Sequence, residues 1–296
     1  MSLDLDPRQR AMLEEMHVRV WSPLTQAAAA TPATLEATTE IAAPTEGAPP
    51  VQAPRERAAA TVRAASADTA TMPLQPRAAA VQTMDWAALQ QAVADCRACA
   101  LCNERKHTVF GMGGLTPQGA DQPPVADWLI VGEAPGEQED LSGLPFVGPA
   151  GQLLDNMLKA IGLDRNRQSA TAASDLAQAA RGCFIANVLK CRPPSNRNPE
   201  GAEVAQCVPY LQRQIELLQP KIILAMGRFA AQTLLHETVP DVLSIPLGKL
   251  RGQVHQYRGI PVVVTYHPAY LLRALGDKAK AWGDLCLAMQ VRQDAA

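Results

Sequence analysis

The chain has 296 residues, with 27 Lys and Arg against 29 Asp and Glu, and a formal net charge of −2. This balance excludes a strongly basic protein that binds nucleic acids without specificity, because such binding needs many cationic side chains. The sequence contains no apolar run of about 18 residues and no signal-peptide pattern, so we expect a cytoplasmic protein without a membrane segment.

Composition divides the chain into a tail and a folded part. Residues 22–84 are rich in Ala, Thr and Pro and poor in large apolar side chains, which is typical of a disordered linker. Within residues 1–21, the stretch 7–21 has apolar side chains at helical spacing, which predicts a short helix that either docks on a protein partner or frays without one. We expect residues 85–296, with equal numbers of basic and acidic side chains, to form the folded domain.

The folded part alternates apolar runs of strand length with amphipathic runs of helix length. The expected strands are Trp128–Val131, Cys183–Leu189, Lys221–Met226 and Pro261–Tyr266, the last in a hairpin with Gln253–Tyr257. The expected helices include Gly151–Ile161, Glu200–Leu218 and Lys278–Val291. This alternation predicts an α/β fold with a mainly parallel sheet that is covered on both faces.

Residues able to bind a ligand stand where the expected strands end. Glu133 follows the first strand, Asn187 lies near the end of the second, and Gly227 and His267 follow the next two. In a parallel sheet these ends meet at one edge, where open α/β proteins bind their ligands. The sequence therefore predicts a site built from loops that are far apart along the chain.

The cysteines form a second pattern. Cys96 and Cys99 make a C-x-x-C motif, and Cys191 and Cys207 follow much later. Disulfides are rare in reducing compartments, so these four predict a metal site. Spacing does not separate zinc from a [4Fe–4S] cluster, and Cys102 is an alternative to Cys99.

Four segments of the sequence resemble the motifs of the family 4 uracil-DNA glycosylases, in the same order. These are G-E-A-P-G-E-Q-E-D at Gly132–Asp140, P-F-V-G-P-A-G-Q-L-L at Pro145–Leu154, N-V-L-K-C-R-P-P-S-N-R-N-P at Asn187–Pro199 and Y-H-P-A-Y-L-L-R at Tyr266–Arg273. The resemblance covers about Asp95 to Leu287. It implies a three-layer α/β/α sandwich with a four-stranded, mainly parallel sheet.

The resemblance also implies a cofactor and a reaction. The cofactor is a [4Fe–4S] cluster held by Cys96, Cys99, Cys191 and Cys207, while Cys102 has no counterpart. The expected reaction starts base excision repair: a monomeric enzyme flips uracil out of single- or double-stranded DNA and hydrolyses its N-glycosidic bond.

Three side chains carry this chemistry by resemblance. Phe146 stacks on the flipped uracil. Asn187 pairs with uracil N3–H and O4, because an amide offers both an acceptor and a donor. His267 donates to O2, where negative charge grows as the bond breaks.

The loop after the first strand forms the sugar side of the expected pocket, with Glu133, Ala134 and Pro135. The related family 1 enzymes have an aspartate for the water at the place of Ala134. The water therefore belongs either to Glu133 or to a backbone carbonyl of the Ala134–Pro135 segment. Glu139 is expected to shape the wall that excludes the thymine methyl group.

The expected DNA contacts lie in two other segments. Leu271 or Leu272 wedges into the base stack to fill the gap that the flipped base leaves. Arg273, together with Arg192 and Arg197, contacts phosphates.

Two other functions are compatible with parts of the sequence. A uracil-DNA binding or cross-linking relative of the same fold would carry an Arg-rich insertion before Phe146, which Ser142–Gly148 does not contain. A Rossmann nucleotide-binding enzyme would need G-x-G-x-x-G, and Gly132-Glu133-Ala134 departs from that pattern.

Overall fold

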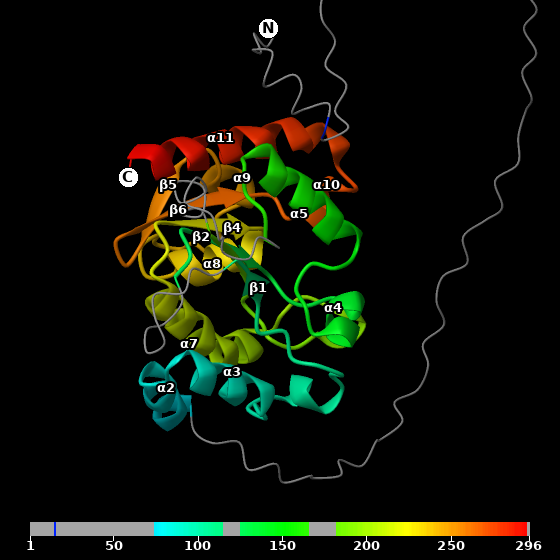
Figure 1. Cartoon of the computed structure of the whole chain (residues 1–296), viewed down its shortest axis with the longest axis vertical. Helices are drawn as coiled ribbons and strands as arrows, with labels where there is room; N and C mark the ends of the chain where they lie inside the picture. Colours follow the sequence, from blue (N-terminus) through cyan, green and yellow to red (C-terminus); the bar gives the residue numbers. More distant parts are fainter. Residues whose placement is uncertain (1–14, 16–73, 115–124, 166–181, 295–296) are drawn as a thin grey trace, which may run out of the picture. The chain divides into compact units, whose positions relative to one another are not determined.

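Four parallel strands form the centre of the domain in the computed structural model (Figure 1). The structure describes Glu15 and residues 74–114, 125–165 and 182–294. The strands are β1 (Met112–Gly113), β2 (Trp128–Gly132), β3 (Cys183–Asn187), β4 (Ile222–Met226), β5 (Val254–Tyr257) and β6 (Ile260–Thr265). Their order in the sheet is β1-β3-β2-β4-β6-β5, with β1 and β5 antiparallel at the two edges.

Helices cover both faces of this sheet. The α-helices are α2 (Leu74–Gln82), α3 (Trp86–Ala94), α4 (Glu137–Ser142), α5 (Pro149–Ala160), α7 (Gly201–Leu218), α8 (Arg228–Leu235), α9 (Leu247–Leu250), α10 (Pro268–Leu271) and α11 (Lys278–Asp294). Short 3-10 turns are η1 (Ala100–Asn103), η3 (Pro194–Asn196) and η4 (Leu275–Asp277). None of the helices in the described part of the chain combines the length and apolar character that a membrane crossing requires.

The apolar side chains of the strands divide between two core clusters. One cluster joins alternate strand residues to α2, α3, α7 and α8, and the other joins the remaining strand residues to α5, α10 and α11. Every residue of β2, β3 and β4 is therefore buried, because both faces of each strand are covered. The predicted three-layer α/β/α arrangement is confirmed.

The sheet has two more strands than the four expected from the resemblance. The hairpin of β5 and β6 was predicted from the sequence, and its turn has left-handed φ angles of 47° at Arg258 and 84° at Gly259. Strand β1 was not predicted, because two residues carry no periodicity. It pairs with β3 at Gly113, where an added Cβ would lie 1.9 Å from the Cys183 carbonyl oxygen.

The strand register brings the predicted loop residues together. Gly132 is opposite Asn187 in the β2–β3 pair, and Met226 is opposite Thr265 in the β4–β6 pair. The segments that begin at Glu133, Gly227 and His267 therefore leave the sheet at the same edge as Asn187. This confirms the convergence that the sequence predicted.

The structure corrects the C-terminal end of the predicted linker. Residues 22–84 were expected to be disordered, but α2 occupies part of that range and Val81 is 1% exposed in the core. Composition failed here because α2 is Ala-rich, and among its described side chains only Val81 belongs to the core cluster. Residues 22–73, and the expected docking helix except Glu15, lie outside the described residues.

The placement of α2 predicts a measurable contribution to stability. Val81→Ala should lower the free energy of unfolding by about 2 kcal/mol, because it removes two buried methyl groups and leaves a cavity. Gln82→Ala changes an exposed side chain on the same helix and should have an effect below about 0.5 kcal/mol. Equal effects of the two substitutions in chemical denaturation would contradict the packing of α2.

Candidate active site

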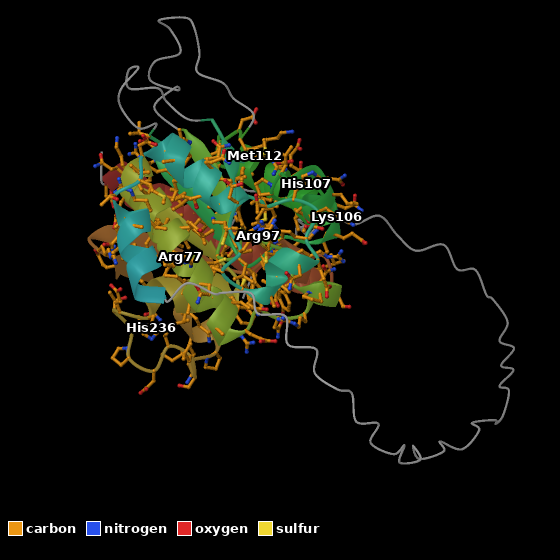
Figure 2. The ribbon with its side chains drawn as sticks, turned by 90° about the horizontal axis from the view of Figure 1, so that it is seen from below. Arg77, Arg97, Lys106, His107, Met112 and His236 are labelled. Atoms are coloured by element: carbon orange, nitrogen blue, oxygen red, sulfur yellow. The ribbon has the colours of Figure 1, made fainter. Side chains whose placement is uncertain are left out.

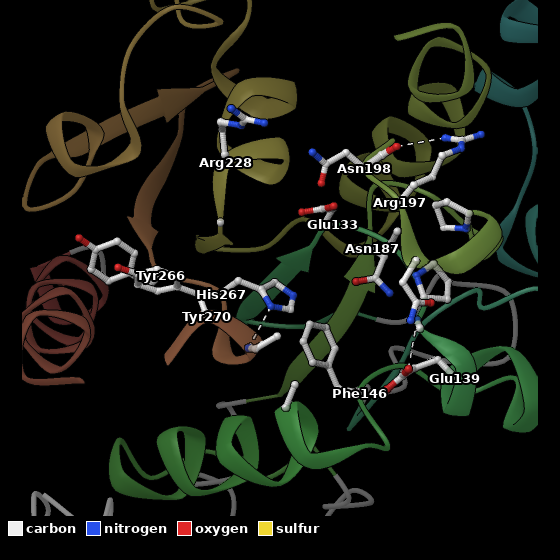
Figure 3. Close-up of a pocket in the computed structure, with 18 of the residues that line it drawn as sticks. Glu133, Glu139, Phe146, Asn187, Arg197, Asn198, Arg228, Tyr266, His267 and Tyr270 are labelled. Carbon is white, nitrogen blue, oxygen red and sulfur yellow. Dashed lines mark hydrogen bonds between the residues drawn. The ribbon is translucent and has the colours of Figure 1, made fainter. Parts of the chain in front are cut away.

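A pocket of about 670 Å³ opens at the edge where the parallel strands end (Figure 3). Loops after β2, β3, β4 and β6 each contribute side chains to its wall. The predicted residues that line it are Glu133, Ala134, Pro135, Glu139, Phe146, Asn187, Arg197, His267 and Arg273. The volume falls in the range of pockets that enclose a small molecule.

The Phe146 ring is held in the pocket by a strained loop. Phe146 has a left-handed φ of 54° and is 4% exposed, so the surrounding structure must hold this backbone in place. Arg165 does so, because its guanidinium donates to the carbonyls of Phe146 at 2.7 Å and Pro145 at 2.9 Å. An ion pair of 2.7 Å with Asp155 orients Arg165 in turn. The Phe146 ring is thereby fixed against His267, with ring centroids 5.5 Å apart.

His267 presents a neutral imidazole to the pocket. It caps α10, and its Nδ1 accepts the backbone N–H of Ala269 at 3.2 Å. This bond leaves the proton on Nε2, which can donate to a ligand. The pKa of His267 is lowered to about 4, mainly by burial; the charge of Glu139 opposes this shift, and the charge of Arg273 adds to it.

The Asn187 amide is buried at the floor of the pocket. Its side chain is 1% exposed, and within the described part of the chain Oδ1 has no hydrogen-bond partner. The Lys190 ammonium donates to the Asn187 backbone carbonyl at 2.9 Å and fixes the end of β3. A buried acceptor without a partner is costly, so it marks a place where a ligand N–H would bind.

Gly132 makes the close approach of these side chains possible. A Cβ at this position would lie 2.4 Å from Asn187 Oδ1 and 2.7 Å from Phe146 Cζ. Both contacts are shorter than real Cβ contacts, so the pocket needs glycine here. Figure 3 shows the Asn187, Phe146 and His267 side chains facing one another.

Glu133 places a carboxyl group on the other side of the pocket. Burial raises its pKa above the usual value, and the positive charge of Arg228 partly offsets this rise. The backbone carbonyl of Glu133 already accepts the N–H of Leu189 at 3.0 Å. The Glu133 carboxylate accepts no hydrogen bond from the described residues, so its oxygens can accept from a ligand or a water in the pocket.

The Glu139 carboxylate braces two loops. It accepts the backbone N–H groups of Gly136 at 3.1 Å, Val147 at 2.9 Å and Gly148 at 3.3 Å. These bonds tie the start of α4 to the segment after Phe146. The contact of Glu139 with the thymine methyl group stays a prediction. In the structure the carboxylate oxygens of Glu139 are bonded to backbone N–H groups of the loop.

The structure distinguishes between the two residues that were predicted as alternatives for the wedge. Leu271 is 0% exposed and packs in the core, whereas Leu272 is 43% exposed. The two residues were alternatives in the sequence, and only Leu272 can reach DNA without unfolding α10. Leu271 belongs to the core because α10 packs on α5 through that side.

The predicted phosphate-binding arginines differ in their partners. Arg197 makes a two-point ion pair with Glu203, at 2.6 and 2.9 Å, and Arg192 lies 3.6 Å from Glu137. Arg273 has no acidic partner among the described residues and lines the pocket. Arg273 is thus the predicted arginine with the most freedom to bind an anion.

Sequence reasoning missed several residues of the pocket wall. Arg228, the first residue of α8, forms no ion pair in the described ranges, although its positive charge acts on Glu133. Tyr266 and Tyr270 form an aromatic pair beside His267, with ring centroids 4.9 Å apart. Tyr266 and Tyr270 lie in the segment Tyr266–Arg273, where an aromatic side chain by itself indicates no chemical role. Arg228 follows a glycine at the end of a strand, which is the available signal.

The four predicted ligand cysteines come together beside the pocket. Cys99, Cys191 and Cys207 share one small apolar cluster, and the charges of Cys96 and Cys99 act on both Cys191 and Cys207. Burial raises the pKa of Cys191 to about 11 and of Cys207 to about 12, so thiolates here need cations beside them. None of the seven cysteines is in a disulfide.

These thiols fit an iron–sulfur cluster better than one ion. The described residues contain no group of three or more His, Cys, Asp or Glu side chains that could hold a metal ion. A [4Fe–4S] cluster binds each thiolate at a different iron, so its ligands stand farther apart than those of a single ion. The donor set, four free cysteines from three segments, suits that arrangement.

The state of His267 gives a direct test of the site. In the protein with ¹⁵N-labelled histidine, NMR should show His267 as the Nε2–H tautomer at neutral pH, with a titration midpoint near 4. The proton should add only at that low pH because the cation would be buried. A midpoint near the ordinary value of about 6.5, or an Nδ1–H tautomer, would contradict the geometry.

Comparisons with known proteins agree with this site. The model of the uracil DNA glycosylase superfamily matches residues 120–286. The type-4 uracil-DNA glycosylase of Sulfurisphaera tokodaii is 38% identical over 187 residues, covering 62% of this chain and 74% of that protein. The type-4 enzyme of Archaeoglobus fulgidus is 38% identical over 184 residues, covering 61% and 79%. That of Pyrobaculum aerophilum is 36% identical over 208 residues, covering 69% and 93%. The chain therefore belongs to the uracil DNA glycosylase superfamily and, within it, to the type-4 uracil-DNA glycosylases.

Proposed function

We propose that this protein flips deoxyuridine out of DNA and hydrolyses its N-glycosidic bond, releasing uracil and leaving an abasic site that starts base excision repair. The names of its type-4 relatives support this reaction. The observation that carries it is the buried Asn187 Oδ1, which has no partner in the described part of the chain and lies in the pocket.

Asn187 is assigned the recognition of the uracil edge. Its Oδ1 accepts uracil N3–H, and its Nδ2 donates to O4. Cytosine presents an acceptor at N3 and donors at N4, so it would leave both amide groups buried and unpaired. A site built for hydrogen bonds rejects such an analogue strongly. Phe146 stacks on the base and closes the other side.

His267 stabilises the departing base. As the glycosidic bond breaks, negative charge grows on uracil O2, and the Nε2–H of neutral His267 donates to it. The low pKa of His267, caused by burial, keeps the imidazole neutral, so it acts as a fixed dipole. No proton needs to move at this step.

We assign the attacking water to the Glu133 side chain. The raised pKa of Glu133 makes its carboxylate a stronger base than an exposed one, and Arg228 limits that rise. Ala134 and Pro135 line the same wall and carry no acidic group. A weakly activated water is sufficient because a dissociative transition state places positive charge on the sugar.

The remaining predicted residues are assigned to DNA and to the cofactor. Leu272 is the wedge, and Arg273 contacts phosphate, with Arg192 and Arg197 at the rim. Cys96, Cys99, Cys191 and Cys207 would hold a [4Fe–4S] cluster. When bound, it would link η1, the segment after β3 and α7 into one structural unit.

The wider setting stays a prediction from the sequence. We expect a cytoplasmic monomer that acts on single- or double-stranded DNA, and a protein partner for residues 7–21. The folded domain would begin at α2, upstream of the residue 85 that the sequence predicted.

One assay tests the reaction. End-labelled single-stranded and duplex oligonucleotides with one uracil should break at that position after alkali treatment. Asn187→Ala should slow release by about 10- to 100-fold, because uracil loses its paired partner. Gln152→Ala, an exposed amide on α5, should retain full rate. Absence of breaks from every substrate would overturn the proposal.

The space at Gly132 gives an independent test. Gly132→Ala should slow uracil release by about 100-fold, because its Cβ displaces the Asn187 amide and the Phe146 ring. Gly201→Ala is a matched control, since its Cβ would meet nothing within 4 Å. A Gly132→Ala enzyme with normal single-turnover rates would show that the pocket does not close as described.

A further inference from the structure

Two arginines outside the pocket donate to the sulfurs of the proposed cluster ligands. We infer that Arg77 and Arg105 neutralise the buried thiolates, so that they slow cluster loss and raise the reduction potential of the cluster. This inference rests on the cofactor in the proposed function and goes beyond it by assigning these two residues a role.

Arg105 bridges the cysteine cluster and α3. Its Nη1 donates to Cys191 Sγ at 3.2 Å, and its Nη2 donates to the Ala94 carbonyl at the end of α3 at 3.0 Å. The second bond fixes the plane of the guanidinium, so the first keeps its direction. Arg105 therefore meets a ligand sulfur with a positioned, charged donor.

Arg77, on α2, contacts a different ligand sulfur, that of Cys96. Its Nη1 lies 3.5 Å from Cys96 Sγ and 3.4 Å from the Tyr210 hydroxyl, and its Nη2 donates to the Gln206 carbonyl. The guanidinium also stands over the Tyr210 ring, 5.1 Å from its centroid. Figure 2 shows Arg77 where α2 lies along α7, the helix that carries Cys207.

The charges around these thiols favour a counter-ion role. Four thiolates give a [4Fe–4S] cluster a net negative charge, and burial of an uncompensated charge is costly. Neither Arg77 nor Arg105 has an acidic partner among the described residues. The acidic Glu203 near Cys99 is itself paired with Arg197 at 2.6 Å. Arg77 and Arg105 therefore balance the sulfurs together with Lys190, whose charge acts on Cys191 and Cys207, and they are the side chains that donate to the sulfur atoms themselves.

The reduction potential of an iron–sulfur cluster depends on the hydrogen bonds to its sulfur atoms and on nearby charges. Donors that stabilise thiolate charge favour the more negative, reduced state of the cluster. Removal of a guanidinium should therefore shift the potential to more negative values and make oxidation easier. Oxidation precedes breakdown, so iron should also be lost sooner.

The test uses the full chain purified without oxygen. Arg105→Gln removes the charge and should bleach the cluster absorbance about tenfold faster under a fixed oxidant and chelator. Its midpoint potential, from an EPR-monitored titration, should become more negative. Arg105→Lys keeps the charge and should restore part of both losses. Arg77→Gln should act in the same direction.

Arg258→Gln is the matched control. Arg258 lies in the β5–β6 turn and forms an ion pair of 3.1 Å with Glu216, so this substitution also removes a paired guanidinium but none that donates to a cysteine. It should leave bleaching and potential unchanged. Wild-type potential and bleaching rate in both Arg105→Gln and Arg77→Gln would overturn the inference. Iron-free wild-type protein would overturn it together with the proposed cofactor. Failure to release uracil, with the expected cluster behaviour intact, would overturn only the proposed reaction.

Discussion

The site depends on one close approach between two neighbouring parallel strands. Gly132 and Asn187 face each other at the ends of β2 and β3, and the missing side chain at Gly132 leaves the room that the Asn187 amide and the Phe146 ring occupy. The register is secure because both strands are buried on both faces, and a slip of one residue would reverse every side chain. The strand register thus fixes Gly132 and Asn187 relative to each other, and the loop that carries Phe146 packs its ring into the space beside them.

Burial shifts the pKa values of the two ionisable pocket residues, His267 and Glu133, in opposite directions. The same desolvation lowers the pKa of His267 and raises the pKa of Glu133, since it disfavours the charged form of each. His267 gains a proton only near pH 4, so it is a neutral donor throughout the physiological range. In the proposed reaction, Glu133 would lose its base function as pH falls through its raised pKa. We therefore expect the acid limb of activity to come from Glu133, because His267 gains its proton only near pH 4.

The sequence predicted the parts of the molecule that have periodic apolar residues or that directly follow a predicted strand. Periodic apolar runs located the parallel strands, and strand ends located Glu133, Asn187 and His267. It could not show which of Leu271 and Leu272 is exposed. The two are adjacent leucines on one helical turn, and the packing of α10 on α5 decides which of them is buried. Nor could it find α2 or β1, which are fixed by contacts with α7 and β3 and carry little pattern of their own.

Charge pairing explains how a neutral domain can receive an anionic ligand. Arg165 forms an ion pair with Asp155, and Arg197 forms one with Glu203. Each pair stabilises a loop beside the pocket. Composition counts these arginines equally with Arg273 and Arg228, which line the pocket and form no ion pair in the described ranges. Coulomb attraction to phosphate is strongest where a charge is not already compensated. Net charge excluded broad, non-specific binding, and the distribution of partners concentrates the positive potential where a flipped nucleotide would enter.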